Sequence, residues 1–185
     1  PTIYNNYISL NNGNGISVGG GATPIIYNNM ITSNGAGIFT FGNATAPIIQ
    51  NNTITANGIG LGCNEYSSPT IYNNTITSNL GGGITCGYHS NPLIKENEVT
   101  SNGGSGISCD VSSPLIMGNK ISSNNFMGIM CSNNASPTIQ GNEITLNNDA
   151  GIHCVNGSRP EIHWNHIIDE GMCNGDSTKI VNATY

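Results

Sequence analysis

The chain carries eight prolines, and they recur at a nearly constant interval. Consecutive prolines are 22 or 23 residues apart, at positions 1, 24, 47, 69, 92, 114, 137 and 160. Each proline opens a similar segment, such as PTIYNNTITSN beginning at Pro69. A fixed period this short is typical of one structural unit stacked on itself, in which each copy contacts only its neighbours. The period therefore predicts a repeat architecture, and it constrains the fold far more than the function.

Three apolar sites recur along the repeat, the first two in all eight copies and the third in seven, and each has mostly polar neighbours. In the copy that begins at Pro69 they are Ile71, Ile76 and Ile84, the last directly after a glycine. This alternation is typical of strands with one buried face, and no segment sustains the 3.6-residue apolar spacing of a helix. The sequence therefore predicts an all-β solenoid of about eight coils with three short strands per coil. We expect these repeats to span residues 1–168 and an irregular end to occupy residues 169–185.

Asparagines recur between the predicted strands. The sixth position of the repeat is Asn in every copy, and the eleventh is Asn in seven copies. In a stack, such a side chain can donate to the carbonyl of one coil and accept from an amide of another. Asn also tolerates the left-handed turn conformation, which is a second reason for it at the eleventh position. We therefore predict structural asparagine ladders at Asn6, Asn29, Asn52, Asn74, Asn97, Asn119, Asn142 and Asn165, and from Asn11 to Asn147.

The full pattern is Pro-x-Ile-x-x-Asn-x-Ile-x-x-Asn followed by Gly-Ile-x-Cys, and it runs to about Ile168. It resembles the repeats of right-handed parallel β-helix proteins of the pectate-lyase-like group. That group includes polysaccharide lyases and hydrolases, uronate epimerases, phage tailspikes, a periplasmic accessory protein for copper assembly, and many surface proteins without known activity. The resemblance implies a single-stranded right-handed parallel β-helix. It specifies the scaffold and leaves the activity open.

The composition limits the partners of the chain. Charged residues make up 8% of the sequence, Lys and Arg total four, and the net charge is −6. A surface for nucleic acid needs several cations on one face, so we expect no nucleic-acid partner. The apolar runs are too short to span a bilayer. Because Pro1 stands where an initiator methionine would, we expect a processed or excised piece of a longer protein, secreted or at the cell surface.

A column of cysteines follows the third apolar site. Each lies two residues after that site, so in a strand it points to the same inward side. We interpret the column as a stack of buried thiols that act as small apolar groups. Neighbouring coils lie within disulfide distance, so the redox state stays open. The column comprises Cys63, Cys86, Cys109, Cys131 and Cys154, whereas Cys173 breaks the period.

No catalytic constellation is evident in the sequence. Pectate-lyase chemistry needs clustered acids for Ca²⁺ and a nearby Arg or Lys as base. The single arginine, Arg159, lies just before a proline, and the acids do not converge. Glu98, Lys120 and Glu143 occupy one column and are read as a surface charge ladder. We therefore predict no catalytic residues and no cofactor.

Two histidines are weak candidates for a metal site. His163 and His166 flank Asn165 in the last repeat, with carboxylates close in sequence. Imidazole with carboxylate can hold transition metals. Polar residues that cap the end of a solenoid are the simpler interpretation, so we predict no metal.

The candidate ligand surface lies on the first strand of the repeat. Tyr4, Tyr27 and Tyr72 share an outward column, with Ile25 and Ile48 on the same face. An exposed strip of this kind marks an interface, and its rings could stack on sugars. The strip could also pair with another chain or lie under another segment. The alternative contact region is the set of loops after the cysteine column, around Glu65, Tyr66, Tyr88 and His89.

Threonines form a second outward array, on the second strand of the repeat. Regular outward threonines resemble those of solenoid ice-binding proteins, although Tyr7 and Glu98 interrupt the plane. Thr is also a good strand residue in its own right. The array comprises Thr32, Thr53, Thr55, Thr75, Thr77 and Thr100.

These features favour a non-catalytic extracellular scaffold or binding module, for surface glycans or for assembly. The first alternative is a polysaccharide lyase, hydrolase or uronate epimerase, and the second is an ice-binding protein. The expected partners are a polysaccharide or other β-helix chains. Self-association would use the solenoid ends or the Tyr/Ile face.

Overall fold

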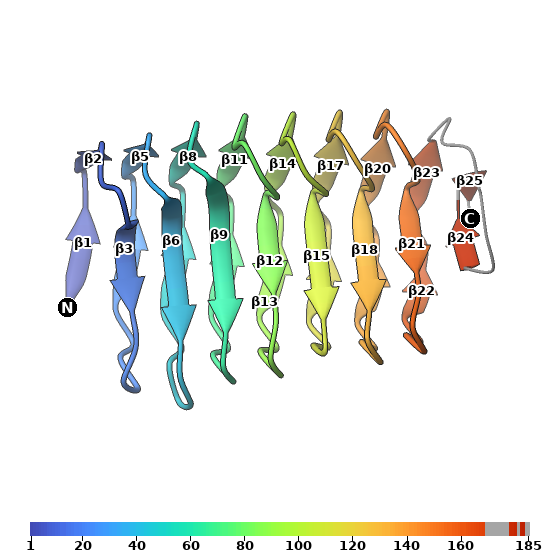
Figure 1. Ribbon diagram of the computed structural model, residues 1–185, viewed down its shortest axis with the longest axis horizontal. Helices are drawn as coiled ribbons and strands as arrows, with labels where there is room; N and C mark the ends of the chain where they lie inside the picture. The colour runs from blue at the N-terminus through green and yellow to red at the C-terminus, as the bar shows by residue number, and fades with distance from the viewer. Residues whose placement is uncertain (169–177, 181, 184–185) are drawn as a thin grey trace.

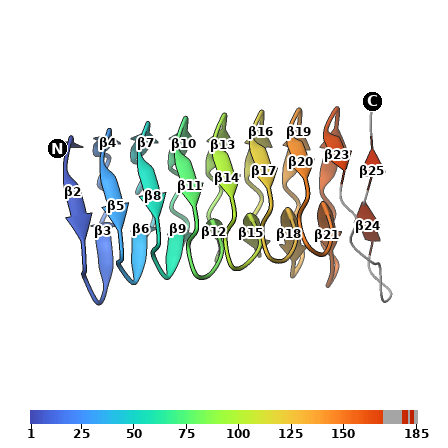
Figure 2. The same ribbon diagram turned by 90° about the horizontal axis from the view of Figure 1, so that it is seen from above.

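The chain folds into a rod of stacked coils made of strands and tight turns. The computed structural model describes residues 1–168, 178–180 and 182–183. Figure 1 shows the coils advancing from the N-terminus to the C-terminus along the long axis, and Figure 2 shows the same stack from above. The described residues contain strands and no helix, with three strands in each coil. The predicted all-β solenoid is thus confirmed.

The strands form three parallel sheets, and each full coil contributes one strand to every sheet, while the last coil contributes strands to the first two sheets only. The first sheet, of eight strands, contains β1 (Thr2–Tyr4), β4 (Ile25–Tyr27), β7 (Ile48–Gln50), β10 (Thr70–Tyr72), β13 (Leu93–Lys95), β16 (Leu115–Met117), β19 (Thr138–Gln140) and β22 (Glu161–His163). The second contains β2 (Tyr7–Ser9), β5 (Met30–Thr32), β8 (Thr53–Thr55), β11 (Thr75–Thr77), β14 (Glu98–Thr100), β17 (Lys120–Ser122), β20 (Glu143–Thr145) and β23 (His166–Ile168). The third contains β3 (Asn14–Val18), β6 (Ala36–Phe41), β9 (Ile59–Asn64), β12 (Ile84–Cys86), β15 (Ile107–Asp110), β18 (Ile129–Ser132) and β21 (Ile152–Cys154).

The core is a set of isoleucine columns that run along the rod. The register pairs Ile71 with Ile94, Ile76 with Val99, and Ile84 with Ile107. All of these side chains are fully buried. Because equivalent residues stack directly above one another, every coil contributes the same apolar groups to its neighbours, as the period predicts.

The asparagine ladders hold the corners of the coil between the sheets. Asn52 Nδ2 donates to the carbonyl oxygens of Ile26 and Gln50, at 3.0 and 2.9 Å, and to Asn74 Oδ1 at 3.0 Å. Its own Oδ1 accepts from the backbone N–H of Asn29 at 3.0 Å. Each buried amide thereby satisfies turn backbone in neighbouring coils, which is the predicted structural role.

The left-handed turn residues lie one position before the ladder asparagines. Asn51 and Ala56 have φ values of 54°, whereas the ladder residues Asn52 and Asn57 that follow them do not have positive φ. The expectation that the eleventh position itself adopts the left-handed conformation is therefore wrong. The ladder side chain must point inward to make its hydrogen bonds, so the preceding residue makes the bend.

A glycine column allows the coils to approach at the corner before the third sheet. A Cβ placed on Gly60 would lie 2.6 Å from Ile76 Cγ2 and would also collide with the carbonyl oxygen of Gly83. The same clash recurs in neighbouring coils, as at Gly37 and Gly106. Only glycine fits here, which explains the Gly-Ile pair that opens the third strand.

The direction of the chain reverses near its C-terminus. β24 (Thr178–Ile180) pairs antiparallel with β21, and β25 (Asn182–Ala183) pairs antiparallel with β23. These strands cover the last edges of the third and second sheets, while β22 ends the first sheet. No segment among the described residues is a helix able to cross a membrane.

Candidate binding site on the third sheet

The Tyr/Ile strip lies on the outer face of the first sheet. Ile25 and Ile48 are 39% and 38% exposed. The rings of Tyr4 and Tyr27 are stacked, with centroids 5.1 Å apart and planes at 6°. Rings stacked along the rod turn their faces toward one another and their edges toward solvent. The strip stays a predicted binding surface, but it offers ring edges at this pair.

A cation occupies part of the same strip further along the rod. Lys95 Nζ lies 5.1 Å from the centroid of the Tyr72 ring, which is a cation–π contact. The ring face of Tyr72 toward Lys95 is therefore already in contact with a protein group. A sugar would have to displace this contact in order to stack there.

The threonine array lies on the second sheet and is in register. Thr53 pairs with Thr75, and Thr55 pairs with Thr77. Thr100 Oγ1 donates to Thr77 Oγ1 at 3.3 Å. Two neighbouring coils carry outward threonines in both columns. The prediction of ice binding remains a prediction, because no observation here tests it.

Two features bound the threonine array along the rod. Met30 precedes Thr53 in one column and is 39% exposed. Glu98 follows Thr75 and forms an ion pair with Lys120 at 3.4 Å. Both ionic groups are about half exposed, so the pair contributes little stability. The flat uncharged part of this sheet is therefore short.

The cysteine column points inward, and its thiols are free. Cys63, Cys86, Cys109, Cys131 and Cys154 are buried and stack in register, and none of them forms a disulfide. Hydrogen bonding to the Cys63 thiol, together with burial, raises the pKa of Cys86 well above its ordinary value. The pKa values of Cys131 and Cys154 are raised in the same way by neighbouring thiols and burial. The interpretation as an inert apolar stack fits this geometry, and Cys173 lies outside the described residues.

The two candidate metal ligands lie in different sheets. His163 is on β22 and His166 is on β23, on either side of a buried ladder asparagine. Glu161 Oε2 is 4.0 Å from His163 Nε2. Within residues 1–168 and the two terminal strands, no three His, Cys, Asp or Glu side chains are placed to hold a metal ion.

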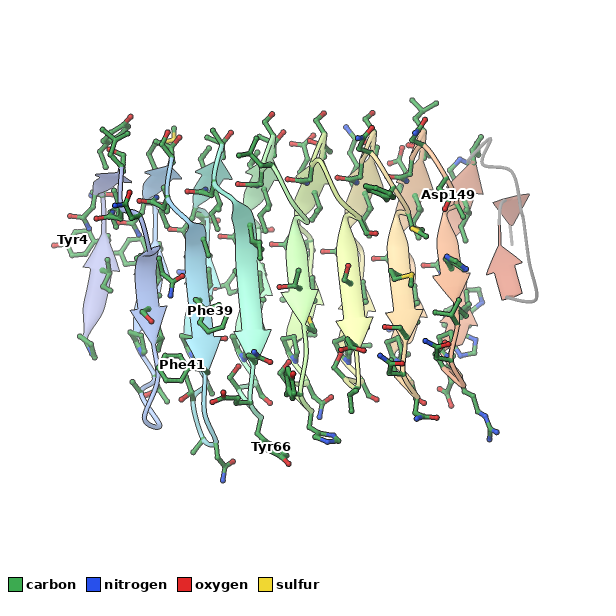
Figure 3. The ribbon with its side chains drawn as sticks, viewed as in Figure 1. Tyr4, Phe39, Phe41, Tyr66 and Asp149 are labelled. Carbon is green, nitrogen blue, oxygen red and sulfur yellow. The ribbon has the colours of Figure 1, made fainter. Side chains whose placement is uncertain are left out.

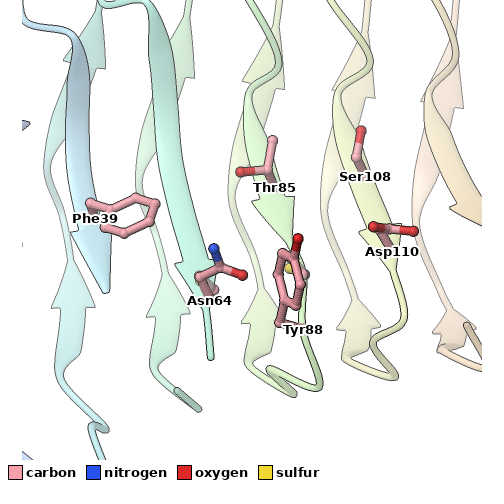
Figure 4. Close-up of a pocket in the computed structure, with 9 residues that line it drawn as sticks. Phe39, Asn64, Thr85, Tyr88, Ser108 and Asp110 are labelled. Carbon is pink, nitrogen blue, oxygen red and sulfur yellow. The ribbon is translucent and has the colours of Figure 1, made fainter. Parts of the chain in front are cut away.

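A pocket opens on the outer face of the third sheet, across β6, β9, β12 and β15. Its volume is about 230 Å³. Figure 4 shows its labelled side chains spread over successive coils, on the strands β6, β9, β12 and β15 and, for Tyr88, on the turn that follows β12. The lining comprises Phe39, Cys63, Asn64, Thr85, Cys86, Gly87, Tyr88, Ser108 and Asp110. We call this the third-sheet pocket.

One wall of the pocket exists because a glycine interrupts an outward column. Phe39 pairs with Gly62, and Gly62 pairs with Thr85. A Cβ on Gly62 would lie 2.6 Å from Phe39 Cδ2, so the phenyl ring leans over the glycine (Figures 3 and 4). The next outward residues, Thr85 and Ser108, are small. The hollow therefore lies between the ring and the following coils.

The floor contains a second interruption, at Gly87. This glycine lies between Asn64 and Asp110 in the column after the cysteines. A Cβ on Gly87 would lie 3.1 Å from Asn64 Oδ1. Asn64 Oδ1 is buried and has no hydrogen-bond partner. An unsatisfied buried acceptor is rare in a folded protein, and here it lines a pocket.

Asp110 supplies the charge of the pocket. Its Oδ1 accepts hydrogen bonds from Ser132 Oγ at 3.1 Å and from Asn133 Nδ2 at 2.6 Å. Both of these donors lie in the next coil, and they fix the carboxylate against the sheet. It is the only carboxylate in the pocket lining.

The rim is a turn of bulky residues in the left-handed conformation. Tyr88 and His89 have φ values of 46° and 62°, and Glu65 and Tyr66 have 50° and 65°. Tyr66 stacks on His89 at 5.3 Å. Such a conformation costs about 1–2 kcal/mol for a residue with a side chain.

Three other coils make the same turn with residues that suit it better. Their left-handed pairs are Gly20 with Gly21, Asn133 with Asn134, and Asn156 with Gly157. In the coil of Asp110, Val111 is left-handed at the first of the two positions, with φ 48°. The bulky left-handed residues of this turn thus fall in three successive coils that contribute to the pocket, and local strain of this kind concentrates at binding sites.

The sequence reveals part of this site. Tyr66 and Tyr88 belong to the predicted alternative contact region, whereas Phe39, Asn64 and Asp110 were not predicted. The sequence feature that marks the pocket is a glycine in place of a larger residue in each of two outward columns, at Gly62 and Gly87. Whether such a glycine opens a pocket depends on which residues lie in the adjacent coils.

Comparison with protein families identifies the family to which the chain belongs. The model of a right-handed beta helix region matches residues 1–136 and again residues 58–183. The chain belongs to the right-handed β-helix family. Curated proteins and solved structures gave no match. Membership of the β-helix family defines the scaffold and leaves the function open.

Proposed function

We propose that the chain is a non-catalytic glycan-binding module that holds a sugar ring in the third-sheet pocket. The observation that carries this proposal is the pocket itself, about 230 Å³ in volume, walled by the rings of Phe39 and Tyr88 and lined by polar side chains that include Asp110. Sugars combine apolar ring faces with hydroxyl groups, which matches aromatic walls beside polar side chains. A secreted or cell-surface location belongs to the same proposal.

The strain of the rim supports a binding role. A turn that Gly or Asn makes easily in other coils is made by Tyr88 and His89 here, and Tyr88 is 66% exposed. Exposed left-handed residues such as Leu146 also occur outside the pocket, but Tyr88 is an aromatic one that lines it. Contact with a ligand would account for an aromatic ring at this position.

The single carboxylate of the pocket favours binding over hydrolysis. Glycoside hydrolysis uses two carboxyl groups that flank the scissile bond. The pocket lining holds one, Asp110, and two groups of the neighbouring coil bind it. Lyase, hydrolase and epimerase activities are therefore the second candidates. Release of new unsaturated or reducing ends from uronate polymers, with or without Ca²⁺, would contradict the non-catalytic proposal.

The proposal is tested by replacing Tyr88 with glycine. Tyr88→Gly removes the exposed ring and relieves the strain, so the melting temperature should stay equal or rise. Affinity for the best ligand of a glycan array, measured by calorimetry, should fall about tenfold or more because a stacking contact is lost. No bound glycan, or unchanged affinity in the folded variant, would overturn the proposal.

Leu146→Gly is the matched control. Leu146 is also exposed and left-handed, with φ 58°, but it lies outside the pocket. This variant should show the same change in stability and unaltered glycan affinity. The comparison separates relief of strain from loss of a ligand contact.

A further inference from the structure

We infer that the third-sheet pocket selects amino sugars over neutral sugars and selects against uronates. The inference rests on the proposed function, because it names the class of sugar that this site would take. It is carried by the hydrogen-bonding character and the charge of the groups that line the pocket.

The charged group of the pocket is an acceptor. The carboxylate of Asp110 can only accept hydrogen bonds, whereas Asn64, Thr85, Ser108 and Tyr88 carry groups that can donate as well as accept. Both hydrogen bonds of Asp110 to the next coil end on Oδ1. A ligand group that binds the carboxylate must therefore present a donor, as hydroxyl and ammonium groups do.

The length of the pocket suits a single sugar ring. Its residues Asn64 and Asp110 lie two coils apart, so their backbones are about 10 Å apart along the rod at about 4.8 Å per strand. A pyranose ring with a hydrogen bond of about 2.9 Å at either end spans a comparable length. Gly87, which has no side chain, lies in the coil between them.

The charges around the pocket oppose an anionic ligand. Asp110 is the only charged residue in the lining, and no lysine or arginine lines the pocket. Lys95 contacts Tyr72 on the first sheet, and Lys120 pairs with Glu98 on the second sheet. A uronate carboxylate placed here would lose water without gaining a cation, next to a like charge. A protonated amine would gain a charge-assisted hydrogen bond to Asp110.

The test uses three sets of β-1,4-linked oligosaccharides of equal length, built on glucosamine, glucose and glucuronic acid. Affinities are measured by calorimetry at a mildly acidic pH, where the amine is protonated, and at low and high salt. We expect the glucosamine oligomer to bind about tenfold more tightly than the glucuronate oligomer, with the glucose oligomer between them. Salt should weaken glucosamine binding and leave glucose binding nearly unchanged.

Asp110→Asn provides the specific variant. It keeps an acceptor oxygen but removes the charge, so the preference for glucosamine over glucose should fall to about threefold or less. Glucose affinity should fall less than glucosamine affinity, because a hydroxyl donor loses only a charge-assisted hydrogen bond whereas the amine also loses its ion pair. The salt dependence of the unmodified protein gives an independent readout if the variant folds poorly.

The outcomes separate the inference from the proposed function. Uronate binding that equals or exceeds glucosamine binding, and that Tyr88→Gly abolishes, overturns the inference and leaves glycan binding standing. A glucosamine preference that Asp110→Asn and salt both fail to alter overturns the role of the carboxylate. Absence of all saccharide binding, or binding that is insensitive to Tyr88→Gly, overturns both.

Discussion

The first and third sheets of this β-helix both bury a regular column of apolar residues, mostly isoleucine, on their inner faces. Their outer faces differ. On the first sheet every strand has three residues, and the outward column is filled without a break, so that Tyr4 stacks on Tyr27 and Tyr72 contacts Lys95. On the third sheet, Gly62 and Gly87 interrupt the outward columns, and Phe39 leans into the space. The inner repeat stabilises the rod, whereas the pocket arises where the outer repeat is broken.

The largest effect is expected from the inner repeat. Asn74→Ala removes three side-chain donations, to Ile49 O, Tyr72 O and Asn97 Oδ1, and leaves the N–H of Asn52 without its acceptor. Since each buried group left unsatisfied costs about 1–3 kcal/mol, the free energy of unfolding should fall by about 3 kcal/mol or more. Urea denaturation measures this.

The control for the ladder is the preceding residue. Asn73 is exposed and left-handed, with φ 52°, so Asn73→Gly should leave the free energy of unfolding within about 1 kcal/mol of its original value. Similar urea midpoints for Asn74→Ala and Asn73→Gly would show that the ladder does not stabilise the rod.

A smaller effect is expected from filling the break in the outer repeat. Gly87→Ala places a methyl group 3.1 Å from Asn64 Oδ1, on the floor of the pocket. Glycan affinity should fall about tenfold, while the backbone is not left-handed at this glycine and stability should change by less than about 1 kcal/mol. Gly13→Ala, where an added methyl would meet nothing within 4 Å, should change neither quantity. Full glycan affinity in Gly87→Ala would place the ligand elsewhere.

The thiol column should make stability depend on alkaline pH. Folding raises the pKa of Cys86, Cys131 and Cys154 above the ordinary 9.0, so the unfolded chain loses these protons first. Stability is therefore fully present at pH values about one unit or more below 9 and falls increasingly as the pH rises from there. By pH 9 the three thiols should already reduce the free energy of unfolding by about 1 kcal/mol in total.

Urea denaturation at a series of pH values measures this dependence. The triple variant of these cysteines to alanine should show a flatter profile between pH 8 and 10. An equally steep profile in that variant would assign the pH dependence to other groups.

The smallest effect on binding is expected from the first sheet. Replacing Tyr27 and Tyr72 together with alanine removes partly exposed rings, so folding should remain nearly intact. If the third-sheet pocket holds the glycan, affinity should stay within about threefold of the original value. A tenfold loss of affinity, or of self-association in sedimentation, would move the contact to the Tyr/Ile strip, which is the surface predicted from the sequence.

The inner half of the structure could be predicted because every coil obeys the same constraint. Ile71, Asn74 and Cys86 occupy columns that repeat along the chain, and repetition identifies their role without knowledge of the neighbours. The sequence pattern predicts the left-handed backbone conformation at the ladder asparagine, one position after the residue that adopts it. The pattern does not show which of the two residues must turn so that the asparagine side chain can point inward.

The pocket could not be predicted in the same way. Asn64 and Asp110 are single departures from the repeat, and Phe39 acquires its role only because the residue above it is Gly62. A departure from a repeat carries chemical meaning only when the adjacent coils are known. Only the tyrosines of the rim were conspicuous enough to be named from the sequence.

Each coil of the stack contacts only the coils next to it, so coils can be added or removed without disturbing distant ones, unlike the elements of a globular domain. All residues that line the pocket fall between Phe39 and Asp110. Duplication of a whole 23-residue coil beyond β18 would lengthen the rod by about 4.8 Å and leave every contact of the pocket in place. The length of the rod and the shape of the pocket can therefore change independently, because neither depends on contacts that the other needs.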